Sequence, residues 1–326
     1  MWEYVTKRYV LTGCIQMEAI SKLELHYYFN DDSHDIDAIT RNKCEAEMLA
    51  IVYEVATILD IKTQLVAEIP LEGGFRDKWK ALGENSPQLQ VILMTVGLLT
   101  TIYFTYDPES NARKKELEQL QIQELKLKLK QLKAKDNIEE IAQITANKIS
   151  KNLKIIKRKS NLYTHLNNNS RIEKVSINVL DSSNIPLHKE TVINRQVFRE
   201  FILSTNKLRA EEDDNAQIEL ISPVLKDGNY KWKGIYKDQT ISFNMYDQKF
   251  KESIFIDGLN FHAGTSIICV LRIRRELDEI GEVKIKGYSV PTVIEVLNGQ
   301  SPHETTQGKA HRHAKSMYDN QSDLFS

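Results

Sequence analysis

The sequence predicts an α+β protein built from successive parts. Apolar and polar residues alternate over short stretches near both ends of the chain, which predicts strands, whereas three- and four-residue apolar spacings between them predict helices. The predicted parts are a small N-terminal α+β domain (1–72), an amphipathic interfacial segment (73–88), a transmembrane-like helix (89–106), a charged helical stalk (111–166), a C-terminal antiparallel β-rich, sensor-like domain with short helices (171–298) and a disordered tail (299–326).

Bulk composition excludes several classes of protein. The chain has 326 residues, enough for two domains, and a formal net charge of -1, so its overall charge predicts no partner. Cys14, Cys44 and Cys269 are widely separated and odd in number, which argues against a disulfide framework and fits a reducing compartment. The first ten residues lack the pattern of a secretory signal, so membrane insertion would have to come from an internal segment.

The N-terminal domain is predicted to be a β-β-α-β unit. Residues 9–11 and 23–29 have strand patterns, residues 36–59 have the apolar spacing of an amphipathic helix, and residues 61–69 form a further strand. The acidic cluster at residues 31–37 lacks the glycine and the terminal glutamate of a calcium loop. It is therefore interpreted as the cap of the helix that follows.

An interfacial helix is predicted directly before the apolar run. Phe75, Trp79 and Leu82 share one helical face, whereas Arg76, Lys78 and Lys80 lie largely off it. Aromatic rings at the depth of the lipid headgroups and cations near the phosphates are typical of such a helix. The same spacing also suits packing on a protein core.

Residues 89–106, LQVILMTVGLLTTIYFTY, are the only long apolar run. As a helix, 18 residues span roughly 27 Å, close to the roughly 30 Å of a hydrocarbon core. The run has no charge, but it contains threonines that could line a pore or face another helix: Thr95, Thr100, Thr101 and Thr105. The run is interpreted as a membrane span, with a buried core or an oligomer-interface helix as the alternative.

The segment after the run is rich in positive charge. Residues 111–160 contain 14 Lys or Arg and 6 Asp or Glu, and Ile122, Leu125, Leu129 and Leu132 follow a heptad pattern. A solvated basic stalk and a contact with nucleic acid or anionic lipid are both compatible with this pattern. The cations favour the cytoplasm for the C-terminal side of a bacterial inner-membrane span, although both flanking domains also fit a wholly cytoplasmic protein.

The C-terminal domain shows six strand patterns and two short helices, with hairpin turns at 227–228 and 237–238. If the strands around 265–273 and 283–296 pair, their outward residues form a stripe of cations ending in a tyrosine: Arg272, Arg274, Lys284, Lys286 and Tyr288. Lys231 and Lys233 form a second basic strand, with Trp232 and Tyr236 on its opposite face. Cations that bind phosphate and rings that stack on bases would suit a nucleotide or a single-stranded oligonucleotide, and an ordinary solvated face is the alternative.

No catalytic motif is found. The sequence lacks a glycine-rich phosphate loop, H-E-x-x-H, paired Cys ligands and a G-x-S-x-G elbow, so neither an enzyme nor a cofactor nor a metal site is predicted. His262 lies in a loop without an identifiable catalytic partner, and His303, His311 and His313 lie in the polar tail. A hydrolase that uses scattered carboxylates and His262 remains a third class of function.

The order of the apolar run, the stalk that begins NARKKELEQL and the strand KIKGYSV resembles the membrane effectors of bacterial anti-phage defence operons, such as the DNA-gated channel subunit of the Hailong system. This resemblance covers architecture only. It implies an antiviral-defence effector that assembles as a homo-oligomer in membrane lipid, forms an ion channel gated by a nucleotide or oligonucleotide at the C-terminal domain, and has an operon-encoded partner enzyme. The alternative is a soluble oligomeric nucleic-acid-binding or adaptor protein whose apolar helix is an assembly core.

Overall fold

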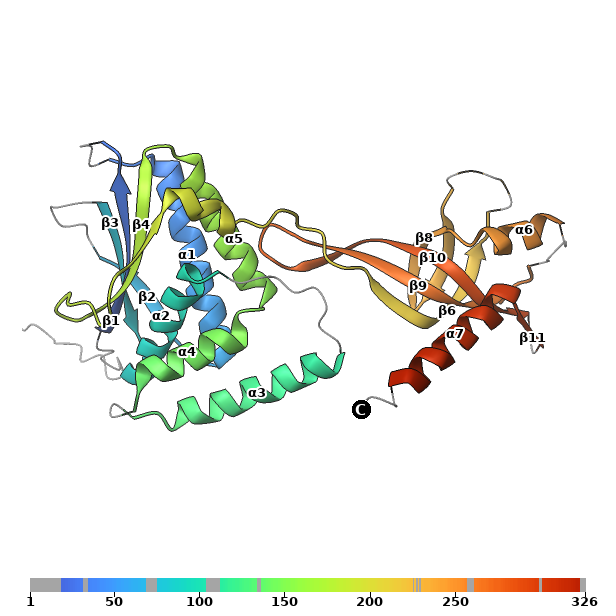
Figure 1. The fold of residues 1–326 in the computed structure, drawn as a ribbon, viewed down its shortest axis with the longest axis horizontal. Helices are drawn as coiled ribbons and strands as arrows, with labels where there is room; N and C mark the ends of the chain where they lie inside the picture. Colours follow the sequence, from blue (N-terminus) through green and yellow to red (C-terminus); the bar gives the residue numbers. More distant parts are fainter. Residues whose placement is uncertain are drawn as a thin grey trace, which may run out of the picture. The chain divides into compact units, whose positions relative to one another are not determined.

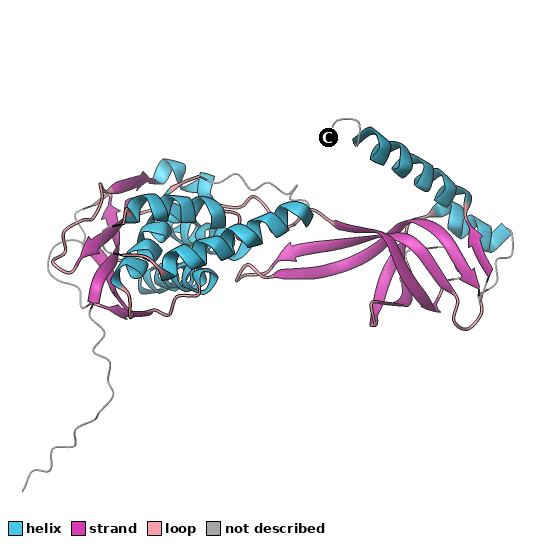
Figure 2. Cartoon of the chain, turned by 90° about the horizontal axis from the view of Figure 1, so that it is seen from below, coloured by secondary structure: helices cyan, strands magenta, loops and turns pink. Residues whose placement is uncertain are grey.

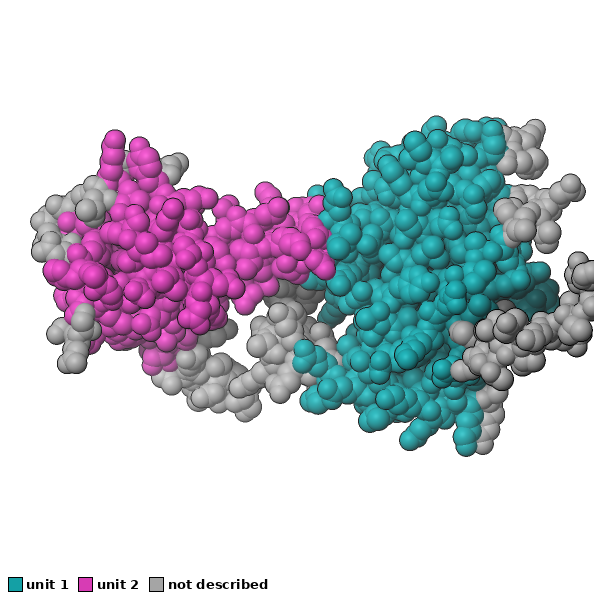
Figure 3. Space-filling view, turned by 180° about the vertical axis from the view of Figure 1, so that it is seen from behind, with its two compact units in different colours: residues 1–204, 279–281 teal, residues 205–278, 282–326 magenta. Residues whose placement is uncertain are grey.

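The computed structural model describes residues 19–31, 35–68, 75–103, 112–133, 136–224, 226, 228, 230–256, 261–298 and 301–322. The chain divides into two compact units (Figure 3). Unit 1 comprises residues 1–204 and 279–281, and unit 2 comprises residues 205–278 and 282–326. This division differs from the predicted one, because residues 172–201 belong to unit 1 rather than to the C-terminal domain.

Unit 1 is built on a five-stranded antiparallel sheet in the order β2-β3-β1-β4-β5. Its strands are β1 (Ala19–Phe29), β2 (Gln64–Ala67), β3 (Phe75–Leu82), β4 (Ile172–Asp181) and β5 (Thr191–Asn194). Leu23 of the central strand β1 lies opposite Trp79 on one side and Val179 on the other. The sheet therefore joins segments from both ends of unit 1.

Helices cover one face of this sheet (Figure 1). They are α1 (Ala38–Leu59), α2 (Ser86–Thr101), α4 (Ile138–Ile149) and α5 (Leu153–Asn168), followed by the short 3-10 helix η1 (Arg195–Phe201). The predicted helix at residues 36–59 is confirmed, and its N-cap is Asp37, whose carboxylate accepts a hydrogen bond from the Thr40 backbone at 2.7 Å. The predicted strand at 9–11 and residues 32–34 of the acidic cluster lie outside the described residues.

The prediction of a transmembrane helix is wrong. The apolar run forms α2, a 16-residue helix of roughly 24 Å that lies in the core of unit 1 with Val91, Val96 and Leu99 fully buried. Thr95 and Thr100 are also fully buried; Thr95 donates a hydrogen bond to the Ala142 carbonyl. Among the described residues, no helix combines the length and apolar content needed to cross a bilayer. Length and hydropathy alone could not separate burial in lipid from burial in protein.

The hydroxyls of Thr100 and Thr101 bond to the backbone of α2 itself. The hydroxyl of Thr100 donates to the carbonyl of Val96 at 2.7 Å, and that of Thr101 donates to the carbonyl of Gly97 at 2.7 Å. Thr105 lies outside the described residues.

The interfacial helix is also corrected, because its residues form strand β3. Asp77, Trp79 and Ala81 are buried with the period of two that a strand requires. The charge of Asp77 concealed this alternation in the sequence; its carboxylate is paired with Arg41 at 2.7 Å. Trp79 is 2% exposed and its indole N–H donates to Glu45, whereas Phe75 is only half-buried, so Trp79 is a core residue of unit 1.

The helical stalk is corrected as well. It consists of α3 (Ala112–Lys130), α4 and α5, and apolar residues of all three helices belong to the core of unit 1. Leu125 and Leu129 of the heptad are 2% and 1% exposed. The heptad face therefore packs within this chain.

Unit 2 consists mostly of strands (Figure 2). They are β6 (Glu211–Ser222), β7 (Trp232–Tyr236), β8 (Gln239–Met245), β9 (Ser266–Leu277), β10 (Val283–Asn298) and β11 (Ser301–Glu304). Their order is β11-β10-β8-β7-β6-β9, and β9 also pairs with β10. This extra pairing closes β6, β7, β8, β10 and β9 into a five-stranded barrel. All pairs are antiparallel except β8 with β10, so the predicted antiparallel sheet is corrected to a barrel with one parallel pair.

Two helices complete unit 2. Helix α6 (Gln248–Ile256), close to its predicted position, connects β8 with β9. Helix α7 (Thr306–Ser322), together with β11, lies in the segment predicted to be disordered. The hydroxyl of Thr305 caps α7 by accepting a hydrogen bond from the Gly308 backbone at 2.9 Å, and Gly308 packs against β10. Residues 301–322 of the predicted tail are therefore part of the fold.

Candidate nucleic-acid interface on the barrel

The barrel of unit 2 has a definite connectivity. When its strands are numbered in chain order, they follow one another around the barrel as 1-2-3-5-4, and strand 4 pairs back with strand 1. Helix α6 lies between the third and the fourth strand in the chain. This is the connectivity of the OB fold, a five-stranded Greek-key barrel. A fold alone does not assign a function, whereas the side chains on its surface determine what it can bind.

Strands β7 and β8 divide their residues cleanly between the interior and the outer face. Trp232 is 1% exposed, and its ring lies 6.3 Å from Phe243, 6.0 Å from Phe250 of α6 and 6.0 Å from Phe261. Lys233 points outward, as the period-two pattern predicted. The aromatic residues of this basic strand are therefore core, whereas its lysines are on the surface.

Gly234 marks the tight pairing of β6 with β7. A Cβ atom there would lie 2.7 Å from the Glu219 carbonyl oxygen and 2.5 Å from the side chain of Ile218. A larger side chain would therefore separate the two strands.

The outer face of β7 and β8 carries cations and hydrogen-bonding groups. Lys231 lies just before β7, and Lys233 pairs across the sheet with Ser242. Both lysines are exposed, and neither forms an ion pair with another described residue. Lys226, in the loop that leads to β7, is also exposed. These lysines thus retain charge for a polyanionic ligand.

Two exposed tyrosines lie at the same end of these strands. Tyr230 precedes β7 and is 56% exposed, whereas Tyr246 follows β8 and is 55% exposed. The hydroxyl of Tyr246 accepts a hydrogen bond from the amide of Asn244 at 3.3 Å, and its backbone N–H donates to Val290 at 2.8 Å. Tyr246 is therefore an exposed ring held on the framework of the barrel.

Two of the four cations of the predicted stripe, Arg272 and Lys284, are paired within the protein, whereas Arg274 and Lys286 are exposed. Strands β9 and β10 do pair, but β6 pairs with the other edge of β9 and places Glu212 opposite Arg272. The two side chains form an ion pair of 2.7 Å. Lys284 pairs with Glu282 at 2.8 Å and with Asp278 at 3.6 Å.

A bulge in β10 redirects the rest of the stripe. The register shifts between Ile285 and Gly287, so Lys286 lies within the shift and Arg274 lies opposite Gly287. A shift of one residue exchanges the two faces of a strand. Tyr288 consequently packs against the core of the barrel, whereas Ile285, predicted to turn inward, is 52% exposed.

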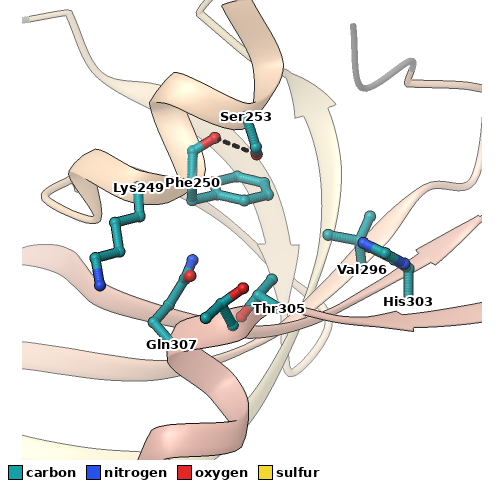
Figure 4. Close-up of a pocket in the computed structure, with 8 residues that line it drawn as sticks. Lys249, Phe250, Ser253, Val296, His303, Thr305 and Gln307 are labelled. Carbon is teal, nitrogen blue, oxygen red and sulfur yellow. Dashed lines mark hydrogen bonds between the residues drawn. The ribbon is translucent and has the colours of Figure 1, made fainter. Parts of the chain in front are cut away.

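Unit 2 also contains two cavities. One, of about 430 Å³, lies among α6, β10, β11 and the start of α7, and residues that line it include Lys249, His303, Thr305 and Gln307 (Figure 4). The hydroxyl of Thr305 is already engaged in capping α7. The second cavity, of about 470 Å³, is lined by residues of all five barrel strands.

Asp213 organises the rim of this second cavity. Its carboxylate accepts hydrogen bonds from the Tyr236 hydroxyl at 2.7 Å and from the Asn215 backbone at 3.2 Å, and it lies 3.3 Å from the ammonium of Lys237. Burial raises the pKa of Asp213, but these hydrogen bonds outweigh it and hold the pKa below its ordinary value. Burial and the bond to Asp213 raise the pKa of Tyr236. At neutral pH this cluster is therefore a carboxylate beside a phenol and an ammonium.

A second polar cluster lies on the sheet of unit 1. Glu24 is 2% exposed and its carboxylate lies 3.4 Å from Arg76, 3.3 Å from Lys78 and 3.2 Å from the amide of Asn178. Nearby His26 is 8% exposed, and burial is the main cause of its lowered pKa. The charges of this cluster pair with one another, which is what a buried structural network requires.

Sequence reasoning located the two lysines of the outer face but missed Tyr246, Ser242 and Asn244. The alternation of β8 already places Ser242 and Asn244 outward, but the position of Tyr246, just after the strand, depends on its bond to β10. The missed carboxylate of Asp213 had no local signal, because its partners come from β7 and the following turn. Within the described residues, no group of His, Cys, Asp or Glu has the arrangement of a metal site.

A scan of protein-family models and searches of curated proteins and of solved structures found no match to this chain.

Proposed function

We propose that this protein binds single-stranded nucleic acid on the outer face of β7 and β8 and on Lys226, Tyr230 and Lys231, which precede β7. The observation that carries the proposal is the pair of exposed tyrosines, Tyr230 and Tyr246, beside exposed lysines that have no ion pair among the described residues. The connectivity of the barrel supports it by analogy, since OB folds bind oligonucleotides on their second and third strands.

The chemistry of this face suits a single strand. Lysine ammonium groups attract the phosphates, and tyrosine rings stack on bases of any sequence because every base has a π-face. Ser242 and Asn244, on the outer face of β8, supply neutral hydrogen-bonding groups beside the lysines and tyrosines. In a duplex the faces of the bases are already stacked, so we expect single strands to bind more tightly than duplexes of the same length.

A charge-removal experiment tests the phosphate contacts. The Lys231→Gln, Lys233→Gln double variant should bind an eight-nucleotide single strand more weakly, with its salt slope reduced by about 1.4, since each phosphate contact to a single strand contributes about 0.7. Fluorescence anisotropy over a range of salt concentrations measures both quantities. Lys309→Gln on α7, also an exposed lysine, is the matched control and should change neither.

Replacing the cation stripe separates the proposed face from the one that the sequence favoured. Neutralising Arg272, Arg274, Lys284 and Lys286 together should weaken binding less than the double lysine variant does, because these cations lie on β9 and β10, away from the proposed face, and Arg272 and Lys284 are already paired with carboxylates. The reverse order of effects would move the binding surface to β9 and β10.

The tyrosines provide an independent test of base stacking. Tyr230→Ala and Tyr246→Ala should each weaken binding by about 5- to 150-fold with little change in salt slope, because stacking on an aromatic ring contributes about 1–3 kcal/mol per base. Tyr→Phe at either position should retain most of the affinity. If the alanine variants bind as the unmodified protein does, the rings are not a stacking platform and the proposal is wrong.

A further inference from the structure

The second cavity occupies the open end of the barrel. Trp232 at the start of β7 packs against Phe250 of α6, so α6 closes the end of the barrel where β7 begins. Tyr236 at the end of β7 lines the cavity, together with residues of the other four barrel strands. The cavity volume of about 470 Å³ lies in the range typical of small-molecule pockets, which are often found in the mouths of β-barrels.

Flat and apolar groups form much of the cavity wall. Tyr236 and Ile273 are 7% and 8% exposed, and Tyr288 is half-buried against the core. Ile285, 52% exposed, is a large apolar side chain on the same wall. Aromatic and branched aliphatic surfaces of this kind favour a planar apolar ring.

The polar groups of the rim carry almost no unbalanced charge. Each of the four carboxylates that line the cavity lies close to a cation: Glu211 to Arg275 at 2.8 Å, Glu212 to Arg272 at 2.7 Å, Asp213 to Lys237 at 3.3 Å and Asp214 to Lys315 at 3.0 Å. Four carboxylates disfavour a phosphate, and their paired cations leave little net attraction for a free cation. The rim does offer both donors and acceptors, including the amide of Gln239.

From this geometry we propose that the cavity receives one nucleobase of the strand bound on the outer face. A nucleobase is planar, uncharged, and has donors and acceptors around its edge, so it matches the wall and the rim together. The inference rests on the proposed function, because the base belongs to a nucleic-acid strand whose phosphates contact the lysines of the outer face.

The outer face leads to the cavity along the strands. Gln239, which lines the cavity, pairs with Tyr236 at the end of β7. Two residues before Tyr236, away from the cavity, Gly234 pairs with Ile241. Lys233, the next residue, is three residues from Tyr236, which corresponds to about 10 Å at the rise of a strand. A nucleic-acid strand whose phosphate contacts Lys233 therefore reaches the cavity within one or two nucleotides.

Ile285→Ala, combined with scanning of the ligand, tests this inference. Eight-nucleotide strands that each carry one abasic site are titrated against the unmodified protein and the variant. In the unmodified protein, an abasic site at one position of the ligand should weaken binding by a factor of about 5 or more beyond the loss that an abasic site causes at the other positions. In Ile285→Ala, that extra penalty should disappear, because the wall that contacts the base has been removed.

Ile221→Ala provides the matched control. Ile221 is 51% exposed, nearly the same as Ile285, but it lies on β6 and does not line the cavity. This variant should show the same loss of affinity at each abasic position as the unmodified protein. The thermal unfolding midpoints of the two variants are compared to account for any general loss of stability.

The outcomes distinguish the inference from the proposed function. If both proteins bind the intact strand and their abasic profiles are the same, the cavity does not receive a base, while binding on the outer face stands. If the unmodified protein binds no single strand, both proposals are wrong. An extra penalty at one position that Ile285→Ala abolishes and Ile221→Ala retains supports the cavity.

Discussion

At the scale of single residues, Lys159 shows how a charge is accommodated inside unit 1. Its side chain is 4% exposed, and its ammonium donates a hydrogen bond of 3.2 Å to the Ile102 carbonyl at the end of α2. It also lies 5.7 Å from the centre of the Phe201 ring, which stacks between Tyr103 and Tyr163. The negative end of the helix dipole and an aromatic face both favour a cation at this position.

Burial nevertheless lowers the pKa of Lys159 to about 8 from 10.5. Between these two pH values the unfolded chain holds a proton that the folded chain has lost, so this group makes the free energy of unfolding rise with pH. Lys159→Met removes this dependence. The stability of the variant relative to the unmodified protein should therefore fall by about 3 kcal/mol from pH 7 to pH 10.5, measured by urea unfolding.

The shape of the pH profile decides this prediction. Lys157→Met, a change at a more exposed lysine of the same helix, should leave the profile unchanged. Parallel profiles for Lys159→Met and the unmodified protein would mean that Lys159 keeps an ordinary pKa in the folded state.

At the scale of elements, the contact between α7 and β10 depends on the absence of a side chain. A Cβ atom on Gly308 would lie 2.8 Å from the Cα atom of Ile294, closer than van der Waals contact allows. Gly308→Ala should therefore displace α7 at a cost of about 1–3 kcal/mol. Hydrogen exchange of residues 306–322 should become faster. Binding through the outer face of β7 and β8 should persist, because α7 contributes no residue to that face.

Substitution of the neighbouring residue serves as the control. Lys309 is exposed and alanine favours a helix, so Lys309→Ala should leave the exchange of α7 at its original rate. Protection of α7 that survives Gly308→Ala would show that the contact can adjust to a methyl group.

The elements that the sequence predicted well have one buried face. Helix α1 and strands β7 and β8 show a clear period because their neighbours cover one side only. The failures have two causes. In β3, Asp77 and Trp79 share the buried face, but the charge of Asp77 disguised the pattern. Arg272 lost its predicted role because its partner Glu212 comes from a strand about 60 residues away, a pairing that local periodicity does not reveal.

For the candidate site, the outward direction of Lys231 and Lys233 was predictable, because period two fixes the face of a short regular strand. The closure of the barrel was not, since it requires the pairing of β10 with both β8 and β9. The cavity and the role of Tyr246 follow from that closure. They became visible only with the tertiary structure.

At the scale of the whole molecule, two separate hydrophobic cores predict two folding units. Val96 is fully buried in unit 1, so Val96→Asp places an unpaired charge there and should cost about 3–5 kcal/mol. Hydrogen exchange should become faster throughout unit 1, while residues 211–277 keep their protection and the protein still binds a single strand.

An exposed position on a neighbouring helix gives the comparison. Ile39 of α1 is 64% exposed, and Ile39→Asp should leave the exchange of both units unchanged. Loss of protection in both units after Val96→Asp would show that they fold as one cooperative structure.

The central strand of unit 1 has a consequence for synthesis on the ribosome. Strand β1 pairs with β4, whose residues follow the end of the apolar helix α2 by about 70 to 80 positions. At about 5–20 residues per second, α2 therefore leaves the ribosome several seconds before the sheet that covers it can be completed. During that interval its apolar surface is open to chaperones and to the targeting factors that sort nascent chains by their hydrophobic segments. Survival of the nascent chain thus depends on how quickly the next three helices emerge and shelter it.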